Sequence, residues 1–300
     1  MKKFKVCFLQ TEWSNEKVLR IYRKMTPNRS GIWKNMIGVT SIDEADYVVI
    51  IDYTKQDIKD KPAVYIGAHP YGHKEGWQCY DNAKNVIAKF DERDTFGFGE
   101  WWLEDDYDTL SALEPPKKTK NLISIISEKY MTPGHQKRRK YMEKFCAEYP
   151  NDIEIYGRIK CFDFEPNIKK CYKGPLGYIS SDVKFPENFQ IGKTEILKQT
   201  RYILEHDDNF GCIHYFSERF FDDLLMWCMP IYTGCGEIYR YLPFNCYINF
   251  DYNTPPKKII EIANSDFREK HLEDIKEARY LLLNKYQLWA RAYEGITGKS

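Results

Sequence analysis

The stretch HYFSERFFDDLLMWCMPIYTG, residues 214–234, combines the signals of a helix and of the buried strand that follows it. Ser217 is a favourable helix N-cap. The apolar residues after it fall on one helical face, at Phe220, Phe221, Leu224, Leu225 and Cys228. Pro230 ends such a helix, and the run MPIYTG is typical of a strand that is buried on both faces. A helix that leads directly into a buried strand indicates an α/β fold.

Arg219 is unusual because it lies in the first turn of this helix. The unpaired N–H groups and the positive dipole end of a helix favour anions and disfavour cations. Glu218 needs no special explanation, since an acid at this end contributes about 0.3–1 kcal/mol of ordinary stabilisation. Two interpretations of Arg219 stay open: a surface ion pair with Asp222 or Asp223, or an anionic ligand such as a phosphate that binds at the start of the helix.

The first half of the chain repeats the α/β pattern. Short runs rich in Val and Ile end in polar or Gly residues, as buried parallel strands do, at residues 4–10, 46–52, 63–67 and 85–90. Between the first two runs, the segment NEKVLRIYRKM at residues 15–25 has helical spacing. We therefore expect a parallel sheet with helices between its strands.

A polar stretch, SALEPPKKTK at residues 111–120, interrupts this pattern and is typical of an interdomain linker. The pattern then restarts with a strand, a helix and a strand, at residues 121–127, 134–149 and 152–157. We predict two α/β domains, residues 1–116 and residues 117–300. After the strand that ends at Gly157 we expect mostly loop to about Gly192, and one long amphipathic helix over residues 271–293.

Composition limits the class of protein. The chain has 300 residues and a net charge of +1, with 45 basic and 44 acidic residues well mixed. Such a balance argues against a nucleic-acid binder that works through a global positive field, and we expect no nucleic-acid partner. Aromatic residues make up 16% of the chain, which indicates a packed globular protein.

The cysteines and the hydropathy pattern point to a location. Nine cysteines, an odd number with no CxxC pair, are best interpreted as reduced, buried side chains in a reducing compartment. The apolar run near the N-terminus is too short for a signal peptide. No window approaches the ~18 continuous apolar residues that a transmembrane helix needs. We therefore predict a cytoplasmic protein without a transmembrane segment.

Residues 215–234 closely resemble the signature of the α-1,3-fucosyltransferases. That family typically has Tyr-x-Thr/Ser-Glu-Lys, a helix with an Asp, and a Pro-(Ile/Val)-(Tyr/Val)-x-Gly turn. Weaker matches cover most of the chain: RYLPFNCYINFD after the signature, Arg138 with its helix, IEIYGR, and IAKFDERD in the first half. The pair Asp208–Asn209 lies at the spacing of the family's Glu-Asn pair, with Glu205 as a rival alignment. The chain also shows a fainter similarity to exostosin-type glycosyltransferases, which share the residue pattern C-x-P-(I/V)…LPF.

The resemblance implies a GT-B fold, in which two Rossmann-like domains face each other and the C-terminal one binds a nucleotide sugar. In the family the donor is GDP-fucose and the reaction inverts the anomeric carbon. The implied roles are ribose binding for Glu218 and pyrophosphate binding for Arg219, where the family has Lys. Arg138 is a second pyrophosphate contact, with Lys137 as its rival. The remaining donor-binding candidates are Asn209, Tyr215, Ser217 and Gly234.

No metal is needed in this scheme, because cations and a helix end can stabilise the departing diphosphate. The DYD run at residues 106–108 could be a metal-binding DxD motif, but it lies in an acidic stretch that we interpret as solvated. We therefore expect no cofactor and no metal ligand set.

The general base is where the resemblance fails. Bacterial fucosyltransferases have a catalytic Glu in a T-G-E-N segment after a strand of the first domain. Here the matching stretch YIGAHPYGHKEG keeps Gly67 but has Ala68 and then His69. His69 is the replacement we name, because its pKa suits proton transfer at neutral pH, although it could simply pack in the loop. Its rivals at or beyond strand ends are Glu12, Asp52 and Glu75.

Two functions of different class are consistent with these residues. The first is an inverting glycosyltransferase that transfers fucose from GDP-fucose to a hydroxyl of a glycan acceptor, with another donor such as UDP-xylose as a variant. The second is a protein that binds a nucleotide sugar or a glycan without turnover. The acceptor itself is not specified by the motifs.

Overall fold

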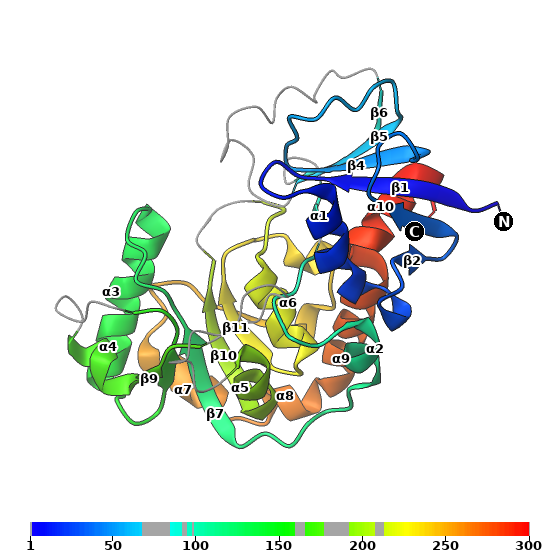
Figure 1. The fold of residues 1–300 in the computed structure, drawn as a ribbon. Coiled ribbons are helices and arrows are strands. Elements are labelled where there is room, and N and C mark those ends of the chain that lie inside the picture. The colour runs from blue at the N-terminus through cyan, green and yellow to red at the C-terminus, as the bar shows by residue number, and fades with distance from the viewer. Residues whose placement is uncertain are drawn as a thin grey trace.

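The computed structural model describes residues 2–67, 85–91, 95–97, 99–159, 166–176, 192–207 and 213–299. Within them the chain forms two sheets of six strands, one mostly parallel and one fully parallel, one in each half of the sequence (Figure 1). The α/β class and the two-sheet organisation expected from the sequence are confirmed. His69, Glu75 and Asn209 lie outside the described residues.

The first sheet has the strand order β2-β3-β1-β4-β5-β6. Its strands are β1 (Phe4–Leu9), β2 (Ile32–Trp33), β3 (Met36–Val39), β4 (Tyr47–Ile51), β5 (Ala63–Ile66) and β6 (Val86–Phe90). The short β2 pairs antiparallel with β3, and the other pairs are parallel. All four runs expected as strands are strands. Every residue of β5 and all but the first of β4 are buried, which explains their unbroken apolar sequences.

The second sheet has the order β12-β11-β10-β7-β8-β9, and all its pairs are parallel. Its strands are β7 (Lys120–Ile125), β8 (Glu154–Tyr156), β9 (Tyr172–Gly174), β10 (Thr200–His206), β11 (Met229–Thr233) and β12 (Ile248–Asn249). Numbered along the chain, this is the 3-2-1-4-5-6 order of a dinucleotide-binding Rossmann sheet. The expectation of mostly loop before Gly192 was wrong for β9 and for the short helix before it.

Helices connect the strands in both halves. In the first half they are α1 (Asn15–Tyr22) and α2 (Tyr107–Ala112), with 3-10 turns at Arg23–Met25 and Pro27–Arg29. In the second half they are α3 (Pro133–Glu148), α4 (Pro166–Cys171), α5 (Lys193–Gln199), α6 (Glu218–Leu225), α7 (Pro256–Ala263), α8 (Phe267–Lys270), α9 (Leu272–Leu281) and α10 (Leu288–Thr297). The 3-10 turns Ile238–Arg240 and Phe244–Cys246 follow β11.

The C-terminal tail is not the single helix that the sequence predicts. A π-helical turn at Leu282–Tyr286 follows α9, and extended backbone at Gln287 (φ −71°, ψ 160°) separates it from α10. α10 then returns to the first sheet and packs against β5 and β6 (Figure 1). The buried Trp289 packs against Phe8, and its indole N–H donates to the backbone oxygen of Tyr22 at 2.8 Å.

Residues 95–97 and 99–103 lie between the two halves, and several of them contact α6. The ring of Phe96 stacks on Phe216 with centroids 4.0 Å apart. The backbone N–H of Gly99 donates to the backbone oxygen of Tyr286 at 2.6 Å. A Cβ atom at Gly99 would lie 1.5 Å from the ring of Phe221, so only glycine permits this approach. These contacts connect Phe96 and Gly99 to α6 and to the residue Phe216 just before it.

Two smaller expectations concern cysteines and membrane helices. The described cysteines, at 7, 146, 171, 228, 235 and 246, are buried and form no disulfides. No helix within the described ranges combines the length and the apolar character needed to cross a bilayer.

Candidate active site

The strand order of the second sheet defines a crevice. From the central pair β7 and β10, the chain proceeds through β8 and β9 to one side and through β11 and β12 to the other. The loops after β7 and β10 therefore turn away in opposite directions. In open α/β sheets, ligands bind at this reversal, outside the carboxyl ends of the strands.

A cavity of about 340 Å³ lies at this point. Four of the side chains that line it are cationic and one is a carboxylate: Lys129, Arg158, Lys193, Arg219 and Glu218. Ile125, Ile126 and Ser127, at the end of β7, form part of its wall, and Trp102 contributes from the segment between the halves. A concave site with this excess of positive charge, beside a helix N-terminus, is suited to a phosphate-bearing ligand.

Gly157 shapes the wall of the cavity at the end of β8. Its φ is +123°, in a region that side chains disfavour, and a Cβ atom would lie 1.9 Å from the carbonyl oxygen of Ile126. The backbone after β8 can therefore cross close to β7 only because residue 157 is glycine.

Arg219 contacts the end of β10. Its Nε lies 3.1 Å from Glu205 Oε1, and its Nη2 lies 3.6 Å from Asp207 Oδ1. Nη2 also donates to the backbone oxygen of His206 at 2.6 Å. These ion pairs of Arg219 are at the end of β10. Asp222 and Asp223 are fully buried, so the alternative of a surface pair with one of them was wrong. Its side chain is 17% exposed and lines the cavity.

Asp207 attaches the start of α6 to β10. It accepts hydrogen bonds from the backbone N–H of Ser217 at 3.1 Å and from the hydroxyl of Tyr232 at 2.5 Å. Ser217 has the N-cap position and backbone conformation that the sequence predicts, but its hydroxyl makes no capping hydrogen bond. A Cβ atom at Gly234 would lie 2.2 Å from the Tyr232 hydroxyl. The glycine in the PIYTG turn therefore makes room for the Tyr232–Asp207 contact.

Lys193 and Asp222 form a second buried pair beside the cavity. Lys193 Nζ lies 2.5 Å from Asp222 Oδ2, and the other oxygen of Asp222 accepts the backbone N–H of Trp102 at 2.9 Å. Burial opposes the Lys193 charge, but Asp222 and Asp223 outweigh it and raise the pKa of Lys193. Burial also raises the pKa of Asp222; the two short contacts favour its ionised form, so we assign an ion pair.

Other donor-binding candidates lie near the same edge. Glu218 is in the first turn of α6 and lines the cavity. Arg138 is 1% exposed and reaches Ser127 Oγ at 3.5 Å, so it lies directly behind the cavity wall and not in its lining. Gly234 lines a separate cavity of about 400 Å³ at the ends of β11 and β12. Tyr215 is half-buried in the segment before α6.

Two of the general-base candidates are described. Asp52 directly follows β4, is 3% exposed, and has left-handed backbone (φ +58°) that Asp tolerates better than most residues. Glu12 follows β1 and is exposed. Both lie at carboxyl ends of strands of the first sheet, as expected.

The DYD run has structural partners. Asp106 caps α2 by accepting the N–H of Thr109 and forms an ion pair with Arg29 at 2.7 Å. Asp108 accepts the backbone N–H of Asn28 at 2.5 Å. Among the described residues, no three His, Cys, Asp or Glu side chains are grouped as a metal site would require.

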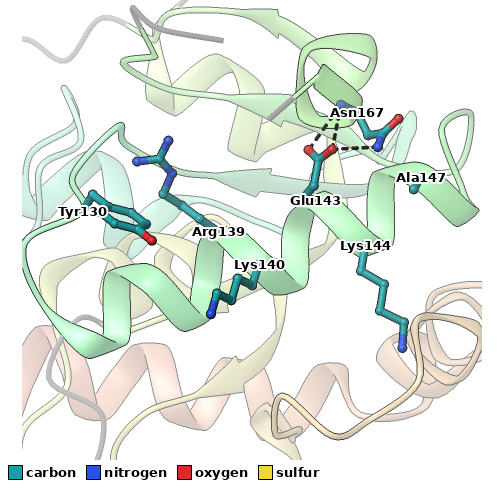
Figure 2. A pocket seen from close by; sticks show the side chains of 7 residues that line it. All are labelled: Tyr130, Arg139, Lys140, Glu143, Lys144, Ala147 and Asn167. Carbon is teal, nitrogen blue, oxygen red and sulfur yellow. Dashed lines mark hydrogen bonds between the residues drawn. The ribbon is translucent and has the colours of Figure 1, made fainter. Parts of the chain in front are cut away.

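A larger cavity, of about 650 Å³, lies on the outer surface of α3 (Figure 2). Its one carboxylate, Glu143, points to the start of α4 and accepts hydrogen bonds from Asn167. Arg139 lies over the ring of Tyr130, 4.7 Å from its centroid. The lining of this larger cavity comes mainly from the middle of α3 and not from the carboxyl ends of the strands, so the candidate site is the cavity of about 340 Å³.

Sequence reasoning missed Lys193 and Asp207. Lys193 follows Gly192 at the start of a helix, which is the same anomaly that drew attention to Arg219. Asp207 directly follows a strand, a position typical of site residues in parallel sheets.

The fold resembles those of solved glycosyltransferases. A structure titled α1,3-fucosyltransferase aligns with all of this chain and 91% of its own, at a TM-score of 0.51 and 11% identity. A glycosyltransferase from Rickettsia africae has a TM-score of 0.56 and 10% identity, over 99% of this chain and 97% of its own. An α-glucosyltransferase in complex with UDP and DNA has a TM-score of 0.55 and 10% identity, over 99% of both chains. These likenesses confirm the GT-B fold.

By sequence, no protein-family model matches the chain, and no curated protein matches it.

Proposed function

We propose that the protein is an inverting glycosyltransferase that transfers a sugar to a hydroxyl of a glycan acceptor. The donor we propose is GDP-fucose. The observation that carries the proposal is the set of four cations around the cavity between β7 and β10. This is where a Rossmann sheet binds a nucleotide diphosphate. The fucosyltransferase signature in residues 215–234 supports fucose, and the fold supports the wider enzyme class.

The donor is oriented by the start of α6. Its diphosphate lies against Arg219 and the first N–H groups of the helix, where the guanidinium and the helix dipole both favour an anion. Glu218 binds the ribose hydroxyls. Lys193, whose charge is maintained by Asp222, adds positive charge to the same cavity.

The transfer breaks the bond between the anomeric carbon and the diphosphate oxygen, and the diphosphate leaves with the electron pair. The acceptor oxygen attacks from the opposite face and loses its proton to a base, for which we propose His69. Cations already held beside the leaving group stabilise its growing charge without rearrangement. A protein that binds the donor without turnover is the alternative, and donor hydrolysis or transfer by the purified protein separates the two.

The binding test is calorimetry with a panel of GDP and UDP sugars, followed by Arg219→Ala. This substitution should weaken GDP binding at least tenfold, because it removes a charge-assisted contact to phosphate. Arg219→Lys should lose less, since it keeps a point charge. Arg201→Ala is the control, because Arg201 lies on β10 at the end away from Glu205 and pairs with Glu269. GDP binding by Arg219→Ala at the wild-type affinity would remove the phosphate role.

We also propose that the chemistry is independent of metal. Transfer should continue in EDTA, since Lys and Arg side chains supply the positive charge around the leaving group. The measurement is the initial rate before and after chelation, with manganese added back. Complete loss in EDTA and recovery with manganese would overturn this proposal.

A further inference from the structure

We infer that Glu205 is a positioning residue for Arg219 that takes up a proton when an anionic diphosphate binds. This inference rests on the proposed function and adds a proton to its binding step. It starts from the contacts of Arg219 with two buried carboxylates at the end of β10, Glu205 in the strand and Asp207 directly after it. In this arrangement the positive charge that should hold the donor is already neutralised by the protein.

The two carboxylates are held differently. Asp207 accepts hydrogen bonds from Ser217 and Tyr232, so its charge has support besides Arg219. Glu205 is 1% exposed, and apart from the ion pair with Arg219 neither of its oxygens accepts a hydrogen bond from the described part of the chain. A buried carboxylate with one ion pair and no accepted hydrogen bond is the more easily protonated of the two.

The surroundings of Glu205 support this difference. Charged groups face it from three helices and its own strand: Arg219 and Asp223 on α6, Lys193 on α5, Arg138 on α3, and Asp207. Burial raises the pKa of Glu205 to about 7 although Arg219 works against the shift. Near neutral pH the site is therefore balanced between the ionised and the protonated form.

An arriving diphosphate disturbs this balance. Its negative charge competes with Glu205 for Arg219, which disfavours the ionised carboxylate and raises its pKa further. Protonated Glu205 leaves Arg219 to the phosphate, and Asp207 keeps the guanidinium in place. By linkage, a group whose pKa rises on binding takes up a proton, so donor affinity falls as the pH rises above about 7.

The first measurement uses the unaltered protein. Calorimetry of GDP-fucose and UDP-glucose in two buffers with different ionisation enthalpies, at pH 8, should show uptake of about one proton per site. Affinity should be about tenfold weaker at pH 8 than at pH 6. The diphosphate of a nucleotide sugar has no titrating proton in this range, so the change belongs to the protein.

The second measurement uses Glu205→Gln, which has nearly the same size and stays neutral. It should remove the proton uptake and the pH dependence, and bind about tenfold more tightly than wild type at pH 8. A residue with only a structural role would weaken binding when altered. The control is Glu154→Gln, which removes a carboxylate of the same sheet that pairs with Lys120 at 2.7 Å.

Thermal stabilisation by sulfate at pH 6.5 and 8.5, compared with Arg219→Gln, probes the anion site without a nucleotide. Sulfate binding that weakens at high pH, with no binding of nucleotide sugars, supports the role of Glu205 and overturns the proposal that the donor is a nucleotide sugar. Nucleotide-sugar binding without proton uptake, or with reduced affinity in Glu205→Gln, overturns the role of Glu205 but not the proposal that the donor is a nucleotide sugar. No binding of either overturns both.

Discussion

At the scale of single residues, the structure explains the cation at the start of α6. The charge of Arg219 is compensated by Glu205 and Asp207, which hold its guanidinium at the end of β10. An arginine can form a planar contact with a carboxylate or a phosphate, so the same side chain can exchange one anion for another. The residue that looks unfavourable for the helix is therefore stabilised by the neighbouring strand.

The general base is tested at the same scale. If His69 takes the acceptor proton, His69→Ala should lower the catalytic rate by roughly 10²–10⁴ and change donor affinity little. The rate should fall as acidification protonates the imidazole, since it can then no longer accept a proton. Rates are measured as a function of pH with saturating donor.

The comparison set consists of Glu12→Gln, Asp52→Asn and Glu75→Gln. Asp52 is the strongest described rival, because it is buried at the end of β4 in left-handed backbone. Loss of activity in one of these variants, with activity kept in His69→Ala, would assign the base to a carboxylate.

At the scale of elements, the position of α6 depends on the segment between the two halves. Trp102 donates its N–H to Asp222 of α6, and Gly99 lies directly against Phe221. The N-terminus of α6 is attached to β10 through Asp207 and Ser217. α6 is thus held at its N-terminus by the end of β10 and at its middle by residues that lie about 120 positions earlier in the sequence.

Gly99→Ala should destabilise the protein by about 1–3 kcal/mol, because the added methyl group must displace the ring of Phe221. The measurement is urea denaturation. The matched control is Gly236→Ala, where a Cβ atom would meet no atom within 4 Å, and its stability should stay within about 0.5 kcal/mol of wild type. Equal losses in the two variants would contradict this packing.

The sequence predicts these elements unevenly. β4, β5 and β11 are continuous apolar runs, so their pattern alone identifies them. β9 has only three residues, YKG, and carries no periodicity that could reveal it. The first turn of α6 drew attention to Arg219, but its partners come from β10, which only the folded sheet brings near. The break at Gln287 was missed because the apolar pattern continues through it.

At the scale of the whole molecule, the C-terminal end of the chain packs against the sheet formed by its N-terminal half. α10 packs on the first sheet although it follows the second one, and Trp289 anchors it against Phe8 and Tyr22. Residues 95–97 and 99–103 come before the second sheet in the chain, and Phe96 and Trp102 among them contact α6. The carboxyl edge of the second sheet carries the cationic cavity.

The central claim is that a nucleotide diphosphate binds at this edge, and a crystal structure of the protein with GDP tests it most directly. The account predicts that the diphosphate lies in the cavity of about 340 Å³, against the Arg219 guanidinium and the first N–H groups of α6. GDP bound elsewhere, such as on the outer surface of α3 beside Tyr130 and Arg139, would contradict it.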